Sequence, residues 1–62
     1  MSNLHEFIGK PLITVEAICQ ASGVKYRITQ VNGRNIVLTR DYISDRLNFK
    51  VENNIIVDVN YG

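Results

Sequence analysis

The stretch TRDYISDRLNFKV, Thr39 to Val51, decides the fold because it joins a charged segment to a clear strand. Its second half alternates polar and apolar residues, with Leu47, Phe49 and Val51 on one side, which is the pattern of a half-buried strand. Its first half, TRDYISD, is charged, lacks Gly and Pro, and follows the apolar run 36–38. An apolar run beside a charged segment makes this region the first candidate for function.

Downstream of this strand, residues 46–61 predict an antiparallel hairpin. Glu52-Asn53-Asn54 has the composition of a turn, because Asn tolerates left-handed backbone conformations. The segment Ile55–Tyr61 alternates again and predicts the last strand. This alternation places Ile55, Val57, Val59 and Tyr61 on one face and Ile56, Asp58 and Asn60 on the other.

Upstream of the loop, residues 14–22 predict one short helix. Thr14 is a suitable N-cap, and Gly23 suits the left-handed position that follows the last helical turn. Apolar residues three and four apart predict one face that packs on the core. This face consists of Val15, Ile18 and Cys19.

A strand-like segment, Lys25–Val31, separates the helix from the long connection Asn32–Asp45. The connection opens with the turn signal Asn32-Gly33. Structureless connections longer than about 12–15 residues are uncommon in compact domains and are usually functional or disordered. The β-branched residues argue against disorder, so two interpretations stay open: an ordered, extended surface loop over 32–45, or another strand over 36–42.

Length and composition limit the class of protein. The 62 residues form one domain, 1–62, near the lower size limit for independent folding. The net charge of +1 gives no basic footprint for nucleic acid or an anionic membrane. The single Cys19 cannot form an internal disulfide, and no Cys/His set suits a metal. We expect no enzyme activity, cofactor, metal, nucleic-acid partner or membrane partner, and we expect a monomer.

The N-terminal segment does not have the pattern of a signal peptide or a membrane span. Glu6, Lys10 and Pro11 interrupt its apolar residues. The compartment therefore stays open between the cytoplasm and a processed secreted or periplasmic segment.

Several residues that could suggest other chemistry have simpler explanations. Asp41 and Asp45 have no neighbour in sequence that would raise a carboxyl pKa, so a catalytic pair is not expected. His5 lies in a polar segment and is expected to be solvated. Cys19 is expected to be a buried structural thiol. Six acidic residues dilute the basic residues Lys25, Arg27, Arg34 and Lys50.

Residues 39–62 resemble the C-terminal half of small serine-protease inhibitors of the bacterial and fungal elastase-inhibitor type, which share the fold of the potato inhibitor I family. The family pattern is a Thr, a variable residue and an acid, then an aromatic, an Asp-Arg pair, an alternating strand and a terminal Gly. In this chain those positions are Thr39, Arg40, Asp41, Tyr42, Asp45-Arg46, residues 47–51 and Gly62. The most specific part of the resemblance is Thr39 to Asn48.

The resemblance implies an α+β fold: one short helix packed on a small mixed sheet of three to four strands, with a long exposed binding loop over 32–45. The strands near 26–31 and 47–51 would run parallel, and the last strand would be antiparallel.

The resemblance also implies that the loop binds a serine protease as a substrate does, with Arg40–Asp41 as the scissile-type bond. A trypsin-like target fits Arg40, because a buried guanidinium needs a carboxylate partner, and a subtilisin-like target stays open. The implied contact residues are Val37, Leu38, Thr39, Arg40, Asp41 and Tyr42.

Finally, the resemblance implies how such a loop is held. In the family, basic side chains on the strand after the loop reach back to the Thr and the acid beside the scissile bond. Arg46 occupies the first such position, and Asp41 is its expected partner through a charge-assisted bond. Asn48, two residues along and on the same strand face, occupies the second supporting position, and Gly62 is the terminal Gly of the pattern. The alternative is a non-inhibitory interaction module on the same fold, which docks through the loop or by β-augmentation.

Overall fold

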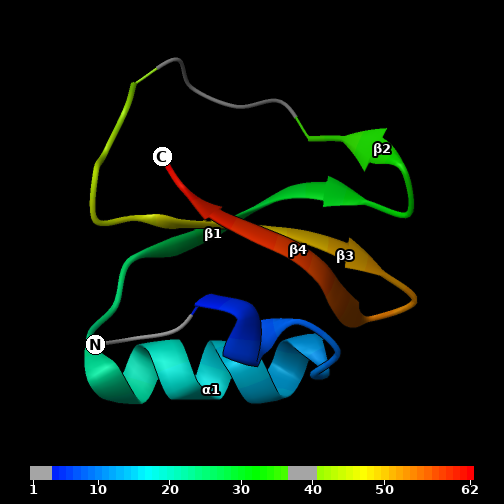
Figure 1. Cartoon of the computed structure of the whole chain (residues 1–62), viewed down its shortest axis with the longest axis horizontal. Coiled ribbons are helices and arrows are strands. Elements are labelled where there is room, and N and C mark those ends of the chain that lie inside the picture. The colour runs from blue at the N-terminus through cyan, green and yellow to red at the C-terminus, as the bar shows by residue number, and fades with distance from the viewer. Residues whose placement is uncertain (1–3, 37–40) are drawn as a thin grey trace.

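The computed structural model of this chain describes residues 4–36 and 41–62. One mixed sheet contains the strands of the described residues, in the order β2-β1-β3-β4, and the helix lies against one of its faces (Figure 1). The predicted α+β class, with one helix on a small mixed sheet, is therefore confirmed. The elements are η1 (Leu4–Phe7), α1 (Leu12–Ser22), β1 (Tyr26–Val31), β2 (Arg34–Asn35), β3 (Leu47–Glu52) and β4 (Ile55–Tyr61).

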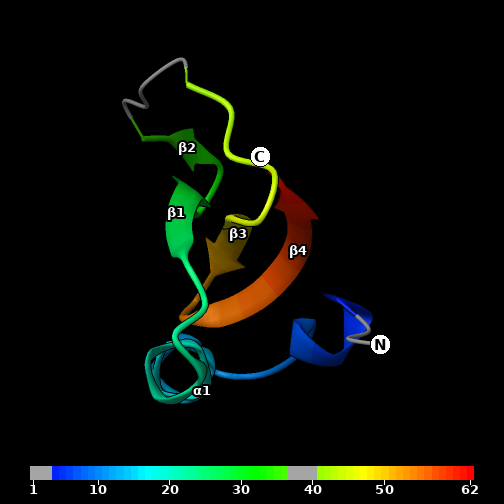
Figure 2. The ribbon, with the colours of Figure 1, turned by 90° about the vertical axis from the view of Figure 1, so that its left-hand side faces the viewer.

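The sheet combines both kinds of strand pairing. β1 and β3 run parallel, as predicted, and β4 is antiparallel to β3. Because parallel neighbours point the same way, the chain must return to the starting end of the sheet between β1 and β3. The described part of this return, residues 41–46, lies on the side of the sheet away from α1 (Figure 2).

The prediction that residues 32–45 form one loop is wrong at its start. Asn32 and Gly33 both take positive φ values, 50° and 80°, which is the conformation that a two-residue hairpin turn requires. The chain turns back there, and β2 pairs antiparallel with β1. The alternative strand over 36–42 does not include Ile36, Asp41 or Tyr42, and its other positions lie outside the described residues.

The helix begins at Leu12 rather than at residue 14, and its N-cap position is Pro11 rather than Thr14. The reason is tertiary, because the Leu12 amide donates to the Asn54 carbonyl at 2.7 Å and so meets one of the open donors of a helix start. Gly23 ends the helix at φ 70°, as predicted. Neither helical element in residues 4–36 and 41–62 is long and apolar enough to span a bilayer.

The core lies between α1, η1 and one face of the sheet, and Phe49 is at its centre. The ring of Phe7 meets Phe49 edge-on at a centroid distance of 5.6 Å, and Tyr26 lies at 6.2 Å. Ile18, which was predicted to face inward, is partly exposed. The buried hydrophobic residues are Val15, Cys19, Leu47, Phe49, Val51, Ile56 and Val59.

The predicted face assignment of β4 is wrong for its first half. Ile56 is fully buried, whereas Val57 is 41% exposed. The pairing with β3 jumps from Lys50–Asp58 to Val51–Ile56, so Val57 has no partner and forms a β-bulge. An extra residue in one strand inverts the alternation on one side of it, so Ile56 lies on the same buried side as Val59, although the predicted alternation separated the two.

Candidate functional site

Arg46 joins the loop to the end of the sheet. Its Nη2 donates to the main-chain carbonyl of Asp41 at 3.0 Å, and its Nη1 lies 3.5 Å from the Asp41 Oδ2. Its Nε donates to the carbonyl of Gly62 at 2.9 Å. The predicted contact between Arg46 and Asp41 is therefore present, and it involves the loop backbone as well as the carboxylate.

The environment of this guanidinium favours a persistent contact. The Arg46 side chain is only 12% exposed, whereas the Asp41 side chain is 52% exposed, so the guanidinium is shielded from water and its carboxylate partner is partly solvated. A hydrogen bond from a charged donor contributes on the order of 2 kcal/mol. Because the planar fork of Arg has fixed donor directions, acceptors on two separate segments define a single geometry for it.

Gly62 is the second partner of Arg46 and is itself buried. Its amide donates to the Arg46 carbonyl at 2.9 Å, so side chain and main chain of Arg46 both bind it. A Cβ at this position would lie 2.7 Å from the Asn48 Nδ2 and 3.9 Å from the ring of Tyr42. The tight approach to Asn48 explains why glycine suits this position, which the family pattern predicted to be a supporting one.

Asn48, the predicted second support, bonds across the sheet. It is 8% exposed; its Oδ1 accepts from the Arg27 Nε at 2.7 Å, and its Nδ2 donates to the Asn60 Oδ1 at 3.2 Å. Arg27 and Asn60 were not identified from the sequence. Alternation with Tyr26 and Ile28 places Arg27 on the face away from the core, but only the strand register brings it opposite Asn48.

The loop itself is described only at its two ends. Val37, Leu38, Thr39 and Arg40, and with them the Arg40–Asp41 bond, lie outside the described residues. On one side, the Ile36 amide donates to the Thr29 carbonyl of β1 at 3.1 Å. On the other side, Asp41 is held by Arg46, and Tyr42 is 74% exposed.

The described contacts fix the chain on both sides of residues 37–40, at Ile36 and at Asp41. Asp41 and Asp45 each face a cation rather than each other, since Asp45 pairs with Lys25 at 3.9 Å. Within residues 4–36 and 41–62, no three His, Cys, Asp or Glu side chains gather as metal ligands would.

No protein-family model, curated protein or solved structure matches this chain.

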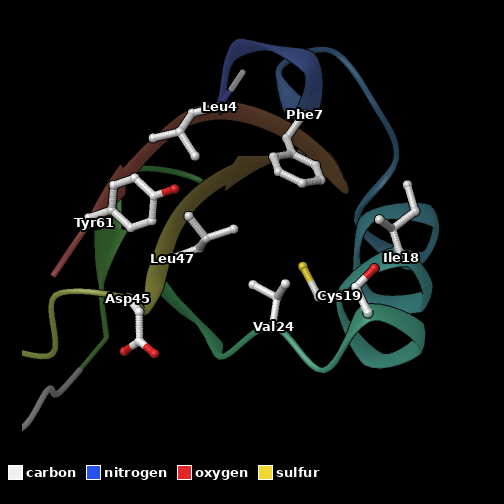
Figure 3. A pocket seen from close by; sticks show the side chains of 9 residues that line it. Leu4, Phe7, Ile18, Cys19, Val24, Asp45, Leu47 and Tyr61 are labelled. Atoms are coloured by element: carbon white, nitrogen blue, oxygen red, sulfur yellow. The ribbon is translucent and has the colours of Figure 1, made fainter. Parts of the chain in front are cut away.

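A cavity of about 300 Å³ on the helix side of the sheet is the other candidate site (Figure 3). Its walls are mostly apolar, and the carboxylate of Asp45 points away from its centre. A small-molecule site normally adds a few convergent polar groups to such walls, and here the Tyr61 hydroxyl is the main one near the centre. The lining residues are Leu4, Phe7, Ile18, Cys19, Ser22, Val24, Asp45, Leu47 and Tyr61.

Cys19, at the wall of this cavity, is almost completely buried. Burial raises the pKa of the Cys19 thiol, and the nearby Glu16 carboxylate raises it further. A thiol with a raised pKa stays protonated at neutral pH and is a poor nucleophile. The cavity is therefore a weaker candidate for a functional site than the loop side of the sheet.

Proposed function

We propose that this chain is a substrate-like inhibitor of a serine protease, which it binds through residues 37–42 with Arg40–Asp41 as the scissile-type bond. The observation that supports this proposal most is the contact of Arg46 with the Asp41 carbonyl, the Asp41 carboxylate and the Gly62 carbonyl. These bonds tie the residue directly after position 40 to the start of β3 and the end of β4.

Rigidity is what separates an inhibitor of this kind from a substrate. Fixing the backbone of one residue costs about 1–2 kcal/mol, so a mobile loop of this length would lose on the order of 10 kcal/mol on docking. A loop that is already ordered by folding has met most of that loss before it binds. Pre-organisation of this kind lets an ordinary interface area give tight binding.

The position of the loop also suits a protease cleft. Residues 41–46 lie on the side of the sheet away from α1 (Figure 2), so a partner can approach without meeting the helix. The exposed side chains of Ile36 and Tyr42 flank the central residues and add contact area. Arg40 supplies the guanidinium for a pocket with an acidic base, as trypsin-like proteases have.

A titration against trypsin and a subtilisin, with a small chromogenic substrate, tests this proposal. We expect micromolar protein to slow at least one of the two enzymes. Arg40→Ala should abolish inhibition of trypsin and leave inhibition of subtilisin, because only the trypsin pocket requires a cation. Arg34→Ala is the matched control, since it removes the same charge from an exposed position on β2.

Rapid cleavage after Arg40, detected by mass spectrometry and without any slowing of the enzyme, would contradict the proposal. That outcome would favour the non-inhibitory interaction module on the same fold. One observation fits this alternative: β4 is an edge strand, and in the described part of the chain only its first residues are paired on the outer side, through Gly9 and Lys10. The remaining edge could accept a strand from a partner.

A further inference from the structure

A row of three polar side chains crosses the loop-facing side of the sheet. Arg27 on β1, Asn48 on β3 and Asn60 on β4 stand directly opposite one another in the strand register. The Arg27 Nε donates to the Asn48 Oδ1 at 2.7 Å, and the Asn48 Nδ2 donates to the Asn60 Oδ1 at 3.2 Å. Asn48 is therefore held from both neighbouring strands.

Arg27 decides which way the Asn48 amide points. A guanidinium can only donate hydrogen bonds, so the amide must turn its oxygen toward Arg27 and its nitrogen toward Asn60. The reverse orientation would set the N–H groups of Asn48 against the guanidinium. Because Asn48 is buried, water cannot relieve that conflict.

The Asn48 amide, oriented in this way, lies close to Gly62. Its Nδ2 fills the space where a side chain at position 62 would start, 2.7 Å from the Cβ position. The carbonyl of Gly62 is the acceptor that fixes the Arg46 Nε at 2.9 Å. A continuous series of contacts thus leads from β1, across the sheet, to the guanidinium that holds Asp41.

We propose that Arg27 is a positioning residue for the loop. By orienting Asn48 against Gly62, it keeps Arg46 in the geometry that binds Asp41. The consequence for protease binding rests on the proposed function, whereas the series of contacts can be tested without any protease. Lys50 provides a contrast on the same face, because its bond to Asp58 is a partly exposed ion pair at 3.9 Å, one row further along the strand.

Amide hydrogen exchange in the Arg27→Ala variant tests this proposal directly. The reporters are the amides of Gly62 and Arg46, which bond to the carbonyls of Arg46 and Ile43 at 2.9 and 3.1 Å. Both should exchange about tenfold faster, as expected for one lost bond from a charged donor. The Ile56 amide, bonded to the Lys10 carbonyl at 3.0 Å on the far edge, lies outside this series of contacts, so it reports opening elsewhere in the fold and its exchange rate should stay within about twofold.

Three further variants sharpen the test. Lys50→Ala removes the same charge from the same face and should leave the Gly62 and Arg46 amides unchanged. Arg27→Lys keeps the charge and one donor, and its exchange rates should lie between those of the wild type and Arg27→Ala. In an Asn48→Ala background, Arg27→Ala should raise the exchange rates of the Gly62 and Arg46 amides by less than about twofold. The reason is that the Asn48 side chain, through which Arg27 acts, is already gone.

The proposal is overturned if the Gly62 and Arg46 amides of Arg27→Ala exchange as in the wild type, or if Ile56 accelerates in step with them. It is also overturned if the effects of Arg27→Ala and Asn48→Ala are additive. Inhibition is measured on the same samples, where Arg27→Ala should weaken binding about tenfold and speed the nick after Arg40. A wild-type protein without inhibitory activity would refute the proposed function, and the exchange data would still decide the role of Arg27.

Discussion

At position 46, a single arginine takes the place that a disulfide occupies in many small rigid domains. The chain has one cysteine, so no covalent link is available inside it. The guanidinium instead binds acceptors on residues 41 and 62, which lie on separate segments. A lysine could not replace it, because an ammonium group lacks the planar set of donors that reaches both.

We expect Arg46→Ala to turn the proposed inhibitor into a temporary substrate. The variant should slow the protease at first and then lose its effect as the bond after Arg40 is cleaved, because Asp41 loses its contacts with the guanidinium. The loss of stability should be about 1–2 kcal/mol, against about 3–5 kcal/mol for Phe49→Ala in the core. Enzyme activity followed over hours, together with the thermal midpoint of each variant, measures both effects.

The control for this prediction is Lys50→Ala, which removes a cation from β3, four residues further along the chain, without touching the loop. Inhibition by Arg46→Ala that persisted as long as that of the wild type would show that the loop does not depend on this contact. Equal destabilisation by Arg46→Ala and Phe49→Ala would mean that Arg46 supports the whole fold rather than the loop.

Among the elements, the alternation rule succeeded on β3 and failed on half of β4 for a physical reason. β3 is paired on both edges, so an extra residue would break two ladders, and Leu47, Phe49 and Val51 all face the core as predicted. β4 is an edge strand and can accommodate the bulge at Val57. Because residues 55–57 are all apolar, their sequence cannot indicate which of them faces inward.

The candidate site divides in the same way between local and distant contacts. The contact of Arg46 with Asp41 was implied by the family resemblance, and it joins two oppositely charged residues that are five apart in the chain. The bond from Arg27 to Asn48 joins residues 21 apart and depends on the register of β1 against β3. That register contains an irregularity after Ile28, which no property of the sequence alone reveals.

On the helix, the buried thiol of Cys19 predicts a pH dependence of stability. Burial raises its pKa above the ordinary value of 9.0 in the folded state only. A group with a raised folded pKa stabilises the fold below its unfolded pKa, and this contribution is lost as the pH rises through the folded pKa. The free energy of unfolding should therefore fall above about pH 9 more steeply in the wild type than in Cys19→Ala.

Urea unfolding at about pH 7 and about pH 10 measures this difference in both proteins. All residues other than Cys19 are the same in the two proteins, so their contributions cancel in the comparison. If the free energy of unfolding fell equally between the two pH values in the wild type and in Cys19→Ala, the thiol would not be desolvated in the folded state. A thiol reagent gives a second measurement, and its reaction at neutral pH should be slow until the protein unfolds.

For the whole molecule, the order of the strands distributes the core over both sides of the proposed scissile bond. Residues 1–40 carry α1, β1 and β2, whereas residues 41–62 carry β3 and β4. The central parallel pair, β1 and β3, takes one strand from each part. Val15 and Cys19 from the first part pack with Phe49 of the second, so neither part can bury its apolar face alone.

This distribution predicts that a nick after Arg40 leaves a folded, non-covalent complex of residues 1–40 and 41–62. The contacts between β1 and β3 and the packing of α1 on β3 do not pass through the cleaved bond, so they survive its loss. The contacts of Arg46 with Asp41 and Gly62 lie within the second fragment and keep the new end close to its original place.

Size-exclusion chromatography should show one species in native buffer and two in denaturant, with mass spectrometry identifying both fragments. Separation of the fragments in native buffer would mean that the loop connection, rather than the shared core, holds the two halves together.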